Sequence, residues 1–337
     1  MPFEGMLRLQ IDGRTIEGTP LHWNEEHVHL LGRDGRLWEF APDEPTELRR
    51  TASRFRPYPP ATLRNQLLGE LGKGYEVSGT GHYLVAHPRG QRDRWARRFE
   101  ELYRAFVHYC SVRGLAVEEP PFPLVGVVCR NRREFARFSA TQGVSSPSGL
   151  LGFFALDTNR IVLYDTGDAA GGDDWHRTAR VIIHEATHQT AFNTGIHGRF
   201  TRPPLWVVEG LATMFESPGV YDSRHHTRRA DRLNRARLDD FRRIAPHHSV
   251  ELLRSIVAGD ELFRVNPGAA YAEAWALTFF LAETRSGKWA RHVARTAAYP
   301  PFTEVSPEQR LADFTAVFGD DWRMLEARFL RFMGGLE

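Results

Sequence analysis

Residues 181–192 read VIIHEATHQTAF and place two histidines four positions apart, with a glutamate directly after the first. On a helix, residues i and i+4 share a face, so His184 and His188 can direct two imidazole nitrogens at one metal ion. Glu185 then lies beside the metal, where a base can take a proton from a metal-activated water. The spacing alone leaves a second interpretation open, in which three polar residues simply share a helix.

A zinc site of this kind needs a third protein ligand and keeps a fourth position open for water. One known pattern requires a glycine and then a histidine soon after His188, and the sequence has neither at those positions. We interpret His197, which comes three residues too late for it, as an ordinary loop residue. The second pattern requires a glutamate on the next helix, and PLWVVEGLATMFE supplies Glu209. The small residues Gly210 and Ala212 beside it predict a close approach between two helices.

HExxH followed by W-x-x-E-G-x-A resembles the gluzincin clan of zinc peptidases, and the second block resembles the same block of the zinc aminopeptidases. The segments HEATHQ, FNTG and PLWVVEGLAT are similar to a bacterial gluzincin family known only as a domain of unknown function. The resemblance covers about residues 75–285. It implies one zinc ion per chain, with His184, His188 and Glu209 as ligands and Glu185 as the general base.

The resemblance also implies an edge strand along which a peptide substrate pairs through its main chain. Gly152, Phe153 and Phe154 occupy that place in this sequence. A plain core strand is the alternative interpretation. The edge strand of the aminopeptidases carries an acidic residue for the free amine of the substrate, and these three positions have none, which favours an endopeptidase.

Peptide hydrolysis by this chemistry needs a hydrogen-bond donor for the oxyanion of the tetrahedral intermediate. The zinc aminopeptidases carry a catalytic tyrosine at a similar distance along the chain after the third ligand. Here Tyr271 lies 62 residues after Glu209, at the expected head of a helix. A core tyrosine packed on Trp275 is the alternative. His225 and His226 are rival donors, which we expect in a solvated loop.

Other residues after the third ligand are candidates for supporting roles. A ligating histidine usually donates its second N–H to a carboxylate or a carbonyl. Thr213 and Glu216 lie one and two helical turns beyond Glu209, and the sequence does not rank them. His247 and His248 lie in a polar stretch that we expect to be mobile, so we regard them as weaker oxyanion donors.

The chain divides into three stretches by pattern. Residues 1–55 alternate apolar and polar positions between Asp-Gly turns, which predicts four or five strands in a small SH3-like β-barrel. Residues 56–74 are predicted to be a linker and a short helix. Residues 75–337 predict an α+β, thermolysin-like gluzincin domain, with a mixed sheet and the metal helices in 75–220 and a helical part in 221–337.

The composition excludes several classes of protein. The formal net charge is only +2 over 337 residues, and no long basic run is interleaved with aromatic residues, so nucleic-acid binding has little support. The two cysteines, Cys110 and Cys129, lie among apolar residues and are expected to be buried thiols. No apolar run is long enough to span a bilayer. The first residues lack a signal-peptide pattern, so we expect a cytoplasmic protein, or an exported one if a leader has been removed.

The main hypothesis from the sequence is therefore a zinc metallopeptidase that acts on a peptide or protein substrate. A rival hypothesis is a non-catalytic zinc protein that holds a peptide in the same groove. The intact Glu185 argues against this rival, because a scaffold does not need the base. A third hypothesis places the function in residues 1–55, as a module that binds peptides or surfaces. The oligomeric state has no signature in the sequence.

Overall fold

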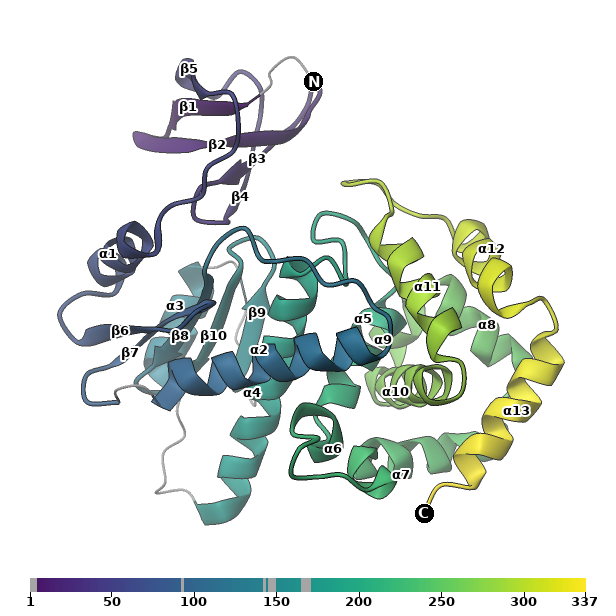
Figure 1. Ribbon diagram of the computed structural model, residues 1–337. Coiled ribbons are helices and arrows are strands. Elements are labelled where there is room, and N and C mark those ends of the chain that lie inside the picture. Colours follow the sequence, from purple (N-terminus) through teal and green to yellow (C-terminus); the bar gives the residue numbers. More distant parts are fainter. Residues whose placement is uncertain (1–4, 92–93, 142–143, 145–149, 165–170) are drawn as a thin grey trace. The chain divides into compact units, whose positions relative to one another are not determined.

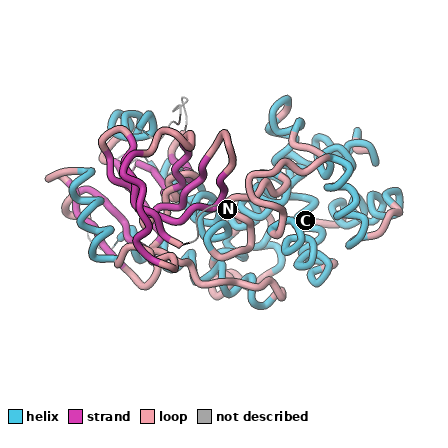
Figure 2. Tube along the Cα trace, turned by 90° about the horizontal axis from the view of Figure 1, so that it is seen from above, coloured by secondary structure: helices cyan, strands magenta, loops and turns pink. Residues whose placement is uncertain are grey.

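The computed structural model describes residues 5–91, 94–141, 144, 150–164 and 171–337. Its contacts divide the chain into two compact units, Met1–Glu100 with Pro120–Thr178, and Glu101–Glu119 with Ala179–Glu337. Helices α2 (Arg94–Val112) and α4 (Gly171–Asn193) each begin in the first unit and end in the second. The described strands all belong to the first unit, and the second unit consists of helices and loops (Figures 1 and 2).

An antiparallel N-terminal sheet opens the first unit. Its strands pair in the order β4-β3-β2-β1-β5 around a small core that includes Leu9, Val28 and Leu30. Asp12 and Gly13 both have positive φ in the turn between the first two strands, which confirms the predicted hairpin. Among the described residues no pairing of β4 with β5 closes this sheet, so a closed SH3-like barrel stays a prediction. The strands are β1 (Met6–Ile11), β2 (Arg14–Trp23), β3 (Val28–Gly32), β4 (Leu37–Phe40) and β5 (Thr46–Ala52).

A second, mixed sheet follows in the same unit. Its order is β6-β7-β8-β10-β9, in which β7, β8 and β10 run parallel and the two outer strands run antiparallel to their neighbours. β9 is therefore an edge strand. The elements are α1 (Pro60–Leu71), β6 (Tyr75–Gly79), β7 (Tyr83–Pro88), β8 (Leu124–Cys129), α3 (Arg132–Thr141), β9 (Gly152–Ala155) and β10 (Arg160–Tyr164).

Helices cover both faces of this sheet. Leu67 of α1 and Phe135 of α3 join the apolar residues of one face in a common core. On the other face the first turns of α2 pack down, with the ring of Phe99 stacked on Tyr83 at 5.2 Å between centroids. Strands buried on both faces read as continuous apolar runs, which is why YLVAHP and PLVGVVC could be recognised as strands.

The N-terminal sheet is joined to the mixed sheet by backbone hydrogen bonds. The Leu37 amide donates to the carbonyl of Asp157, in the turn between β9 and β10, at 2.7 Å. The Tyr58 amide donates to the carbonyl of Arg33 at 2.8 Å, which fixes the linker against the turn before β4. Whether residues 1–55 fold alone, as the predicted boundaries imply, stays a prediction.

The second unit is built around α10, which is buried along most of its length and contacts α5, α7, α8, α9, α11 and α13 (Figure 1). Besides the ends of α2 and α4, its α-helices are α5 (Leu205–Phe215), α6 (Pro218–Tyr221), α7 (Arg235–Ile244), α8 (Val250–Ala258), α9 (Glu261–Val265), α10 (Pro267–Thr284), α11 (Ser286–Ala297), α12 (Pro307–Phe318) and α13 (Trp322–Gly334). Two short 3-10 helices, η1 (Arg229–Arg232) and η2 (Ala245–His247), complete it.

The predicted α+β class is confirmed, as are the long helix over α2, the helix that begins after Pro204 and the helical character beyond residue 225. Cys110 and Cys129 are free and buried, as expected. In the described part of the chain no helix combines the length and apolarity needed to cross a membrane.

Candidate metal centre

Helices α4 and α5 supply the residues of the candidate site, which lies in the second unit. His184 and His188 are one turn apart on α4, as their spacing predicts. On α5 every residue after Leu205 is buried except Glu209, the only ionisable side chain of that helix. The start of α5 is fixed by Asp260, whose carboxylate accepts the Leu205 amide at 3.0 Å. A carboxylate on such an apolar helix is costly unless a cation compensates it.

The three side chains converge on one point. The Nε2 atoms of His184 and His188 lie 3.0 Å apart. The Oε2 atom of Glu209 lies 3.2 Å from the first of these nitrogens and 3.5 Å from the second. All three atoms fall within 4.8 Å of one another, and the residues form a group of metal-binding type.

The chemistry of these donors fits a zinc ion. Two imidazoles and one carboxylate are a common zinc ligand set, and ligands about 2 Å from a tetrahedral ion lie roughly 3.3 Å from each other. Three lone-pair donors at the observed distances repel one another unless a cation lies between them. The Oε2 atom of Glu209 is buried, so its negative charge needs a cation close by. These residues could therefore hold one zinc ion.

The electrostatics of the site point to the same need for positive charge. Burial alone would lower the pKa of His184, but hydrogen bonds with Glu209 and Glu216 outweigh it and raise that pKa well above the ordinary value. Burial would likewise raise the pKa of Glu209, yet the charge of His188 and hydrogen bonds from both histidines lower it. The carboxylates thus favour a proton on the His184 imidazole, where a bound metal ion would take its place.

The ring of His184 is held by the carboxylate of Glu216, which in turn accepts a hydrogen bond from the amide of Asn234. The Nδ1 atom of His184 lies 2.9 Å from Oε1 of Glu216, at the end of α5. Asn234 donates its Nδ2 hydrogens to Oε2 of Glu216 at 3.0 Å and to the carbonyl of Thr213 at 3.1 Å. The hydroxyl oxygen of Thr213 is buried without a hydrogen-bond partner in the described structure. Of the two candidates that the sequence left unranked, the geometry therefore favours Glu216.

Glu185 and Tyr271 also belong to this neighbourhood. The negative charges of Glu209 and Glu185 both favour the protonated form of the Tyr271 phenol, which is also hydrogen-bonded to Glu209. Burial and these charges raise the pKa of Tyr271, so its hydroxyl keeps its proton. Its ring is held by Phe263, with centroids 5.5 Å apart, and by the guanidinium of Arg237, 5.3 Å from the ring centre.

The head of α10 differs from the sequence-based expectation. The helix begins at Pro267, and the side chain of Asn266 accepts the Ala269 amide as its cap, so Tyr271 lies one turn inside the helix. The expectation overlooked the cap signal of an asparagine followed by proline.

The small residue Gly210 has a role other than the one expected from the sequence. A Cβ atom at this position would lie 2.2 Å from the hydroxyl of Thr278 and 2.5 Å from the carbonyl of Ala274. The close approach that it permits is between α5 and α10, rather than one between the two metal helices. Gly210 follows Glu209, and Ala274 lies one turn beyond Tyr271, so this contact sets the spacing between those two side chains.

One histidine, His248, is misjudged by sequence reasoning, and another, His197, is more buried than its loop position suggests. His248 is not in a mobile stretch, because its side chain is fully buried between Glu273, at 3.0 Å, and Glu326, at 2.8 Å. His197 does lie in a loop but is 1 % exposed, and burial lowers its pKa to about 3. His225 is 79 % exposed, in line with the solvated loop expected for it. Polar composition signals exposure only on average, and partners distant in sequence decide individual cases.

The residues expected to bind substrate lie in the first unit. Gly152, Phe153 and Phe154 form most of β9, which pairs with β10 on one side only. The edge position agrees with the expectation. The metal-binding group belongs to the second unit, so the role of β9 toward a substrate stays a prediction.

Asn234 and Arg237 are the residues of this site that sequence reasoning missed. Asn234 caps α7 by accepting the Arg237 amide, and this capping role is visible in the sequence. Its second role, holding Glu216 across 18 residues of chain, has no local signature.

Comparison with known families gives one match. A family model described as "Protein of unknown function (DUF1570)" matches residues 178–303, a span that contains the three residues of the metal-binding group together with Glu185 and Tyr271. A comparison with curated proteins gives no match.

Similar solved structures include mutant M1 zinc metallopeptidases. One, from Deinococcus radiodurans and bound to a Tyr-Ser-Ala substrate, is 14 % identical with a TM-score of 0.42, covering 78 % of this chain and 52 % of its own. Two others are described as two-domain enzymes, and each is 13 % identical to this chain with a TM-score of 0.42. The match with the structure bound to L-arginine covers 77 % of this chain and 51 % of the other. The match with the structure bound to L-tryptophan covers 78 % of this chain and 52 % of the other. This chain thus spans about half the length of these proteins, and a similarity of this size says nothing about its activity.

Proposed function

We propose that this protein is a zinc-dependent metallopeptidase with a thermolysin-like gluzincin site, in which His184, His188 and Glu209 hold one zinc ion. The observation that carries the proposal is the convergence of three donor atoms within 4.8 Å, next to a glutamate in the HExxH position. The carboxylate of Glu216 supports it by fixing the ring of His184.

The chain's own residues then have distinct tasks. A zinc ion bound to these donors supplies Lewis acidity, which polarises a carbonyl and lowers the pKa of water. Glu185 takes the proton of the attacking water and passes it to the leaving amine. Tyr271, protonated and held by Phe263 and Arg237, donates its hydroxyl hydrogen to the carbonyl oxygen as negative charge develops there.

The substrate is proposed to be a peptide or protein that pairs with the edge strand β9. An extended peptide can add to such an edge through main-chain hydrogen bonds. Gly152, Phe153 and Phe154 carry no acidic side chain that would bind a free amino terminus. We therefore propose an endopeptidase rather than an aminopeptidase.

The N-terminal sheet is proposed to be an SH3-like module that is separate from the peptidase part. Chains comprising residues 1–55 and 61–337 can be expressed apart and tested for cooperative melting and for cleavage of a peptide library. Cleavage by the longer chain alone would agree with this division. An aggregated longer chain would show that the sheet covers apolar surface of that part.

The decisive test of the function is Glu185→Gln in the full chain. The variant should keep one zinc per chain by elemental analysis, because Glu185 is not a ligand, and it should lose cleavage of a peptide library. His184→Ala is the matched control and should lose zinc together with activity. The wild-type protein should lose cleavage when a chelator removes its zinc. It should regain cleavage when zinc is returned.

The non-catalytic alternative makes the opposite forecast. If zinc-replete wild-type protein binds peptides of the library but cleaves none, the protein is a zinc-dependent binding module. Loss of zinc in the Glu185→Gln variant would instead show that Glu185 contributes to metal binding, and its assignment as the general base alone would be wrong.

A further inference from the structure

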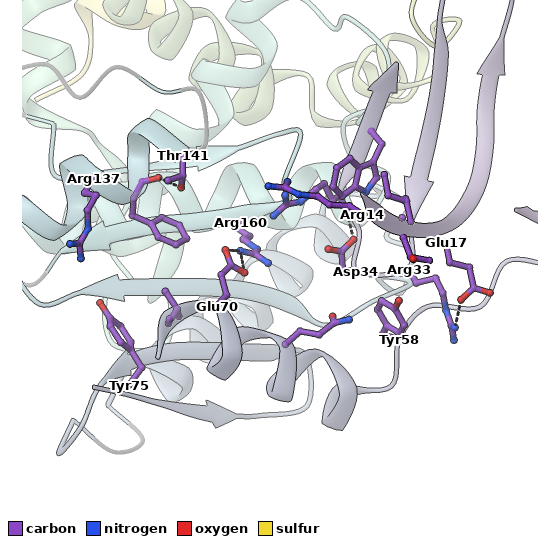
Figure 3. Close-up of a pocket in the computed structure, with 18 of the residues that line it drawn as sticks. Arg14, Glu17, Arg33, Asp34, Tyr58, Glu70, Tyr75, Arg137, Thr141 and Arg160 are labelled. Carbon is purple, nitrogen blue, oxygen red and sulfur yellow. Dashed lines mark hydrogen bonds and ion pairs between the residues drawn. The ribbon is translucent and has the colours of Figure 1, made fainter. Parts of the chain in front are cut away.

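A cavity of about 750 Å³ lies within the first unit (Figure 3), and none of its lining residues belongs to the metal centre. Its walls come from the N-terminal sheet, from α1 and α3, and from the first residues of β6 and β10. The volume is in the range of sites that hold small organic molecules.

Arginines dominate the polar lining of this cavity. Five of them reach it, from the N-terminal sheet and its turn, from α3 and from β10: Arg14, Arg33, Arg36, Arg137 and Arg160. Arg14 and Arg137 belong to opposite walls (Figure 3). Guanidinium groups bind phosphate and carboxylate anions through paired, charge-assisted hydrogen bonds.

The carboxylates of the lining are already engaged. Glu17 accepts from Arg33 at 2.9 Å, and Glu70 accepts from Nη1 of Arg160 through both oxygens at 2.8 Å. Asp34 accepts the backbone amide of Arg36 at 3.1 Å.

The fourth carboxylate, Glu134, is held by Arg130, at 2.7 Å between Oε1 and Nη2, and by the hydroxyl of Tyr75, also at 2.7 Å. Three of the four carboxylates are thus paired with a guanidinium, whereas Asp34, which accepts a neutral backbone amide, keeps its negative charge beside Arg36. The five arginines of the lining still outnumber its four carboxylates, so its net charge favours an anion.

Arg36 forms no ion pair within 4.0 Å among the described residues. Its Nε atom is buried and has no hydrogen-bond partner in the described structure. Its guanidinium lies over the ring of Trp38, 5.3 Å from the ring centre. Burial, and then the charge of Arg160, lower the pKa of Arg36 in spite of the nearby carboxylates of Asp34 and Glu70. An anion in the cavity would relieve this destabilisation.

Aromatic and aliphatic side chains also line the cavity. Trp38 and Tyr58 come from the side of the N-terminal sheet and its linker, and Phe138 comes from α3. The planar guanidinium of Arg33 lies over the Tyr58 ring, 4.5 Å from its centre, so an aromatic ring of this lining can stack with a planar group. A bare inorganic ion would leave this apolar part of the lining unused.

We propose that this cavity binds a small organic anion in which a phosphate or carboxylate group is joined to a flat apolar body. Arg36 and Arg14 bind the anionic group, and the apolar side chains of the two walls, Trp38 on one and Phe138 on the other, contact the body. The site is independent of the metal centre and of the proposed peptidase activity.

Isothermal titration of the full-length protein with phenyl phosphate tests this proposal. Binding should be saturable, with one site per chain, and at least several-fold tighter than that of inorganic phosphate, because the ring adds contact with these apolar side chains. Benzoate, in a parallel titration, distinguishes a carboxylate from a phosphate as the preferred anionic group. Benzamidine, a cation of the same shape as benzoate, should not bind.

Variants locate the site. Arg36→Met should weaken phenyl phosphate binding about tenfold or more, as expected for the loss of a charged hydrogen-bond donor. Arg14→Met, an exposed position whose loss should not disturb folding, should weaken it several-fold. Arg50→Met, at an exposed position of the same sheet outside the cavity, is the matched control and should bind like the wild type.

Several results would overturn the proposal. These are no saturable binding of either organic anion, equal binding of benzamidine, and inorganic phosphate binding as tightly as phenyl phosphate. An equal loss in Arg50→Met and Arg14→Met would also overturn it, because binding would then follow overall charge rather than this cavity.

Discussion

The Nδ1 atom of His184 lies 2.9 Å from Oε1 of Glu216, so this imidazole is held from the side opposite to the metal-binding point. Such partners typically change metal affinity by about 10- to 100-fold when they are removed. We expect Glu216→Ala to weaken zinc binding by a factor in this range, measured by competition with a zinc chelator. Thr213→Val, which removes a hydroxyl without a partner in the described structure, is the control and should leave the affinity nearly unchanged. The reverse ranking would assign the supporting role to Thr213.

Tyr271→Phe should lower kcat by about 100-fold while KM and zinc content stay nearly the same. Loss of one oxyanion donor has this size of effect, and it acts in the transition state rather than on ground-state binding. Steady-state kinetics on a peptide that the wild type cleaves would measure it. Normal turnover in the variant would exclude Tyr271 as the donor and direct attention to His225 and His226.

Gly210→Ala should destabilise the protein by about 1–3 kcal/mol, because the new methyl group meets Thr278 and the Ala274 carbonyl at less than normal contact distance. The midpoint of urea unfolding would report the loss. Gly259→Ala is the matched control in the same unit, since its Cβ would meet nothing within 4 Å. Equal midpoints for both variants would mean that α5 and α10 separate easily.

The stability of the second unit should depend on pH through His292. Burial lowers the pKa of this side chain to about 4, from an ordinary value of 6.5. Between these values the unfolded chain binds a proton that the folded chain does not, so the free energy of unfolding falls as the pH falls, by on the order of 3 kcal/mol over the whole window.

His292→Leu removes this term. We expect the difference in unfolding free energy between pH 7 and pH 5 to shrink by about 2 kcal/mol, measured by urea titration followed through tryptophan fluorescence. Trp206, stacked on His292 with centroids 5.5 Å apart, provides a local signal. The exposed His225, changed to glutamine, is the control. An unchanged pH dependence in His292→Leu would show that this histidine takes up its proton without unfolding.

The sequence predicts the elements of the fold and the metal-binding group for local reasons. The i, i+4 spacing of His184 and His188 follows from helical geometry, and the apolar runs of β7 and β8 follow from burial on both faces. Glu209 stands out because it is the single charge in an apolar helix. Each of these signals lies within a few residues of chain.

What the sequence does not predict depends on partners distant in the chain. The choice of Glu216 over Thr213 depends on Asn234, 18 residues away from Glu216. The burial of His248 depends on Glu273 and Glu326, at separations of 25 and 78 residues. The cavity lined by Arg36 and Arg160 joins segments that no periodic pattern connects.

Because Asn234 hydrogen-bonds both to α7 and to Glu216, the metal centre is coupled to local unfolding at the start of α7. One side chain both caps the first turn of α7 and holds the carboxylate behind His184. A fluctuation that frays this turn therefore also releases Glu216. Amide hydrogen exchange at the start of α7 should consequently slow when zinc binds, so that a turn which contributes no ligand reports on metal occupancy.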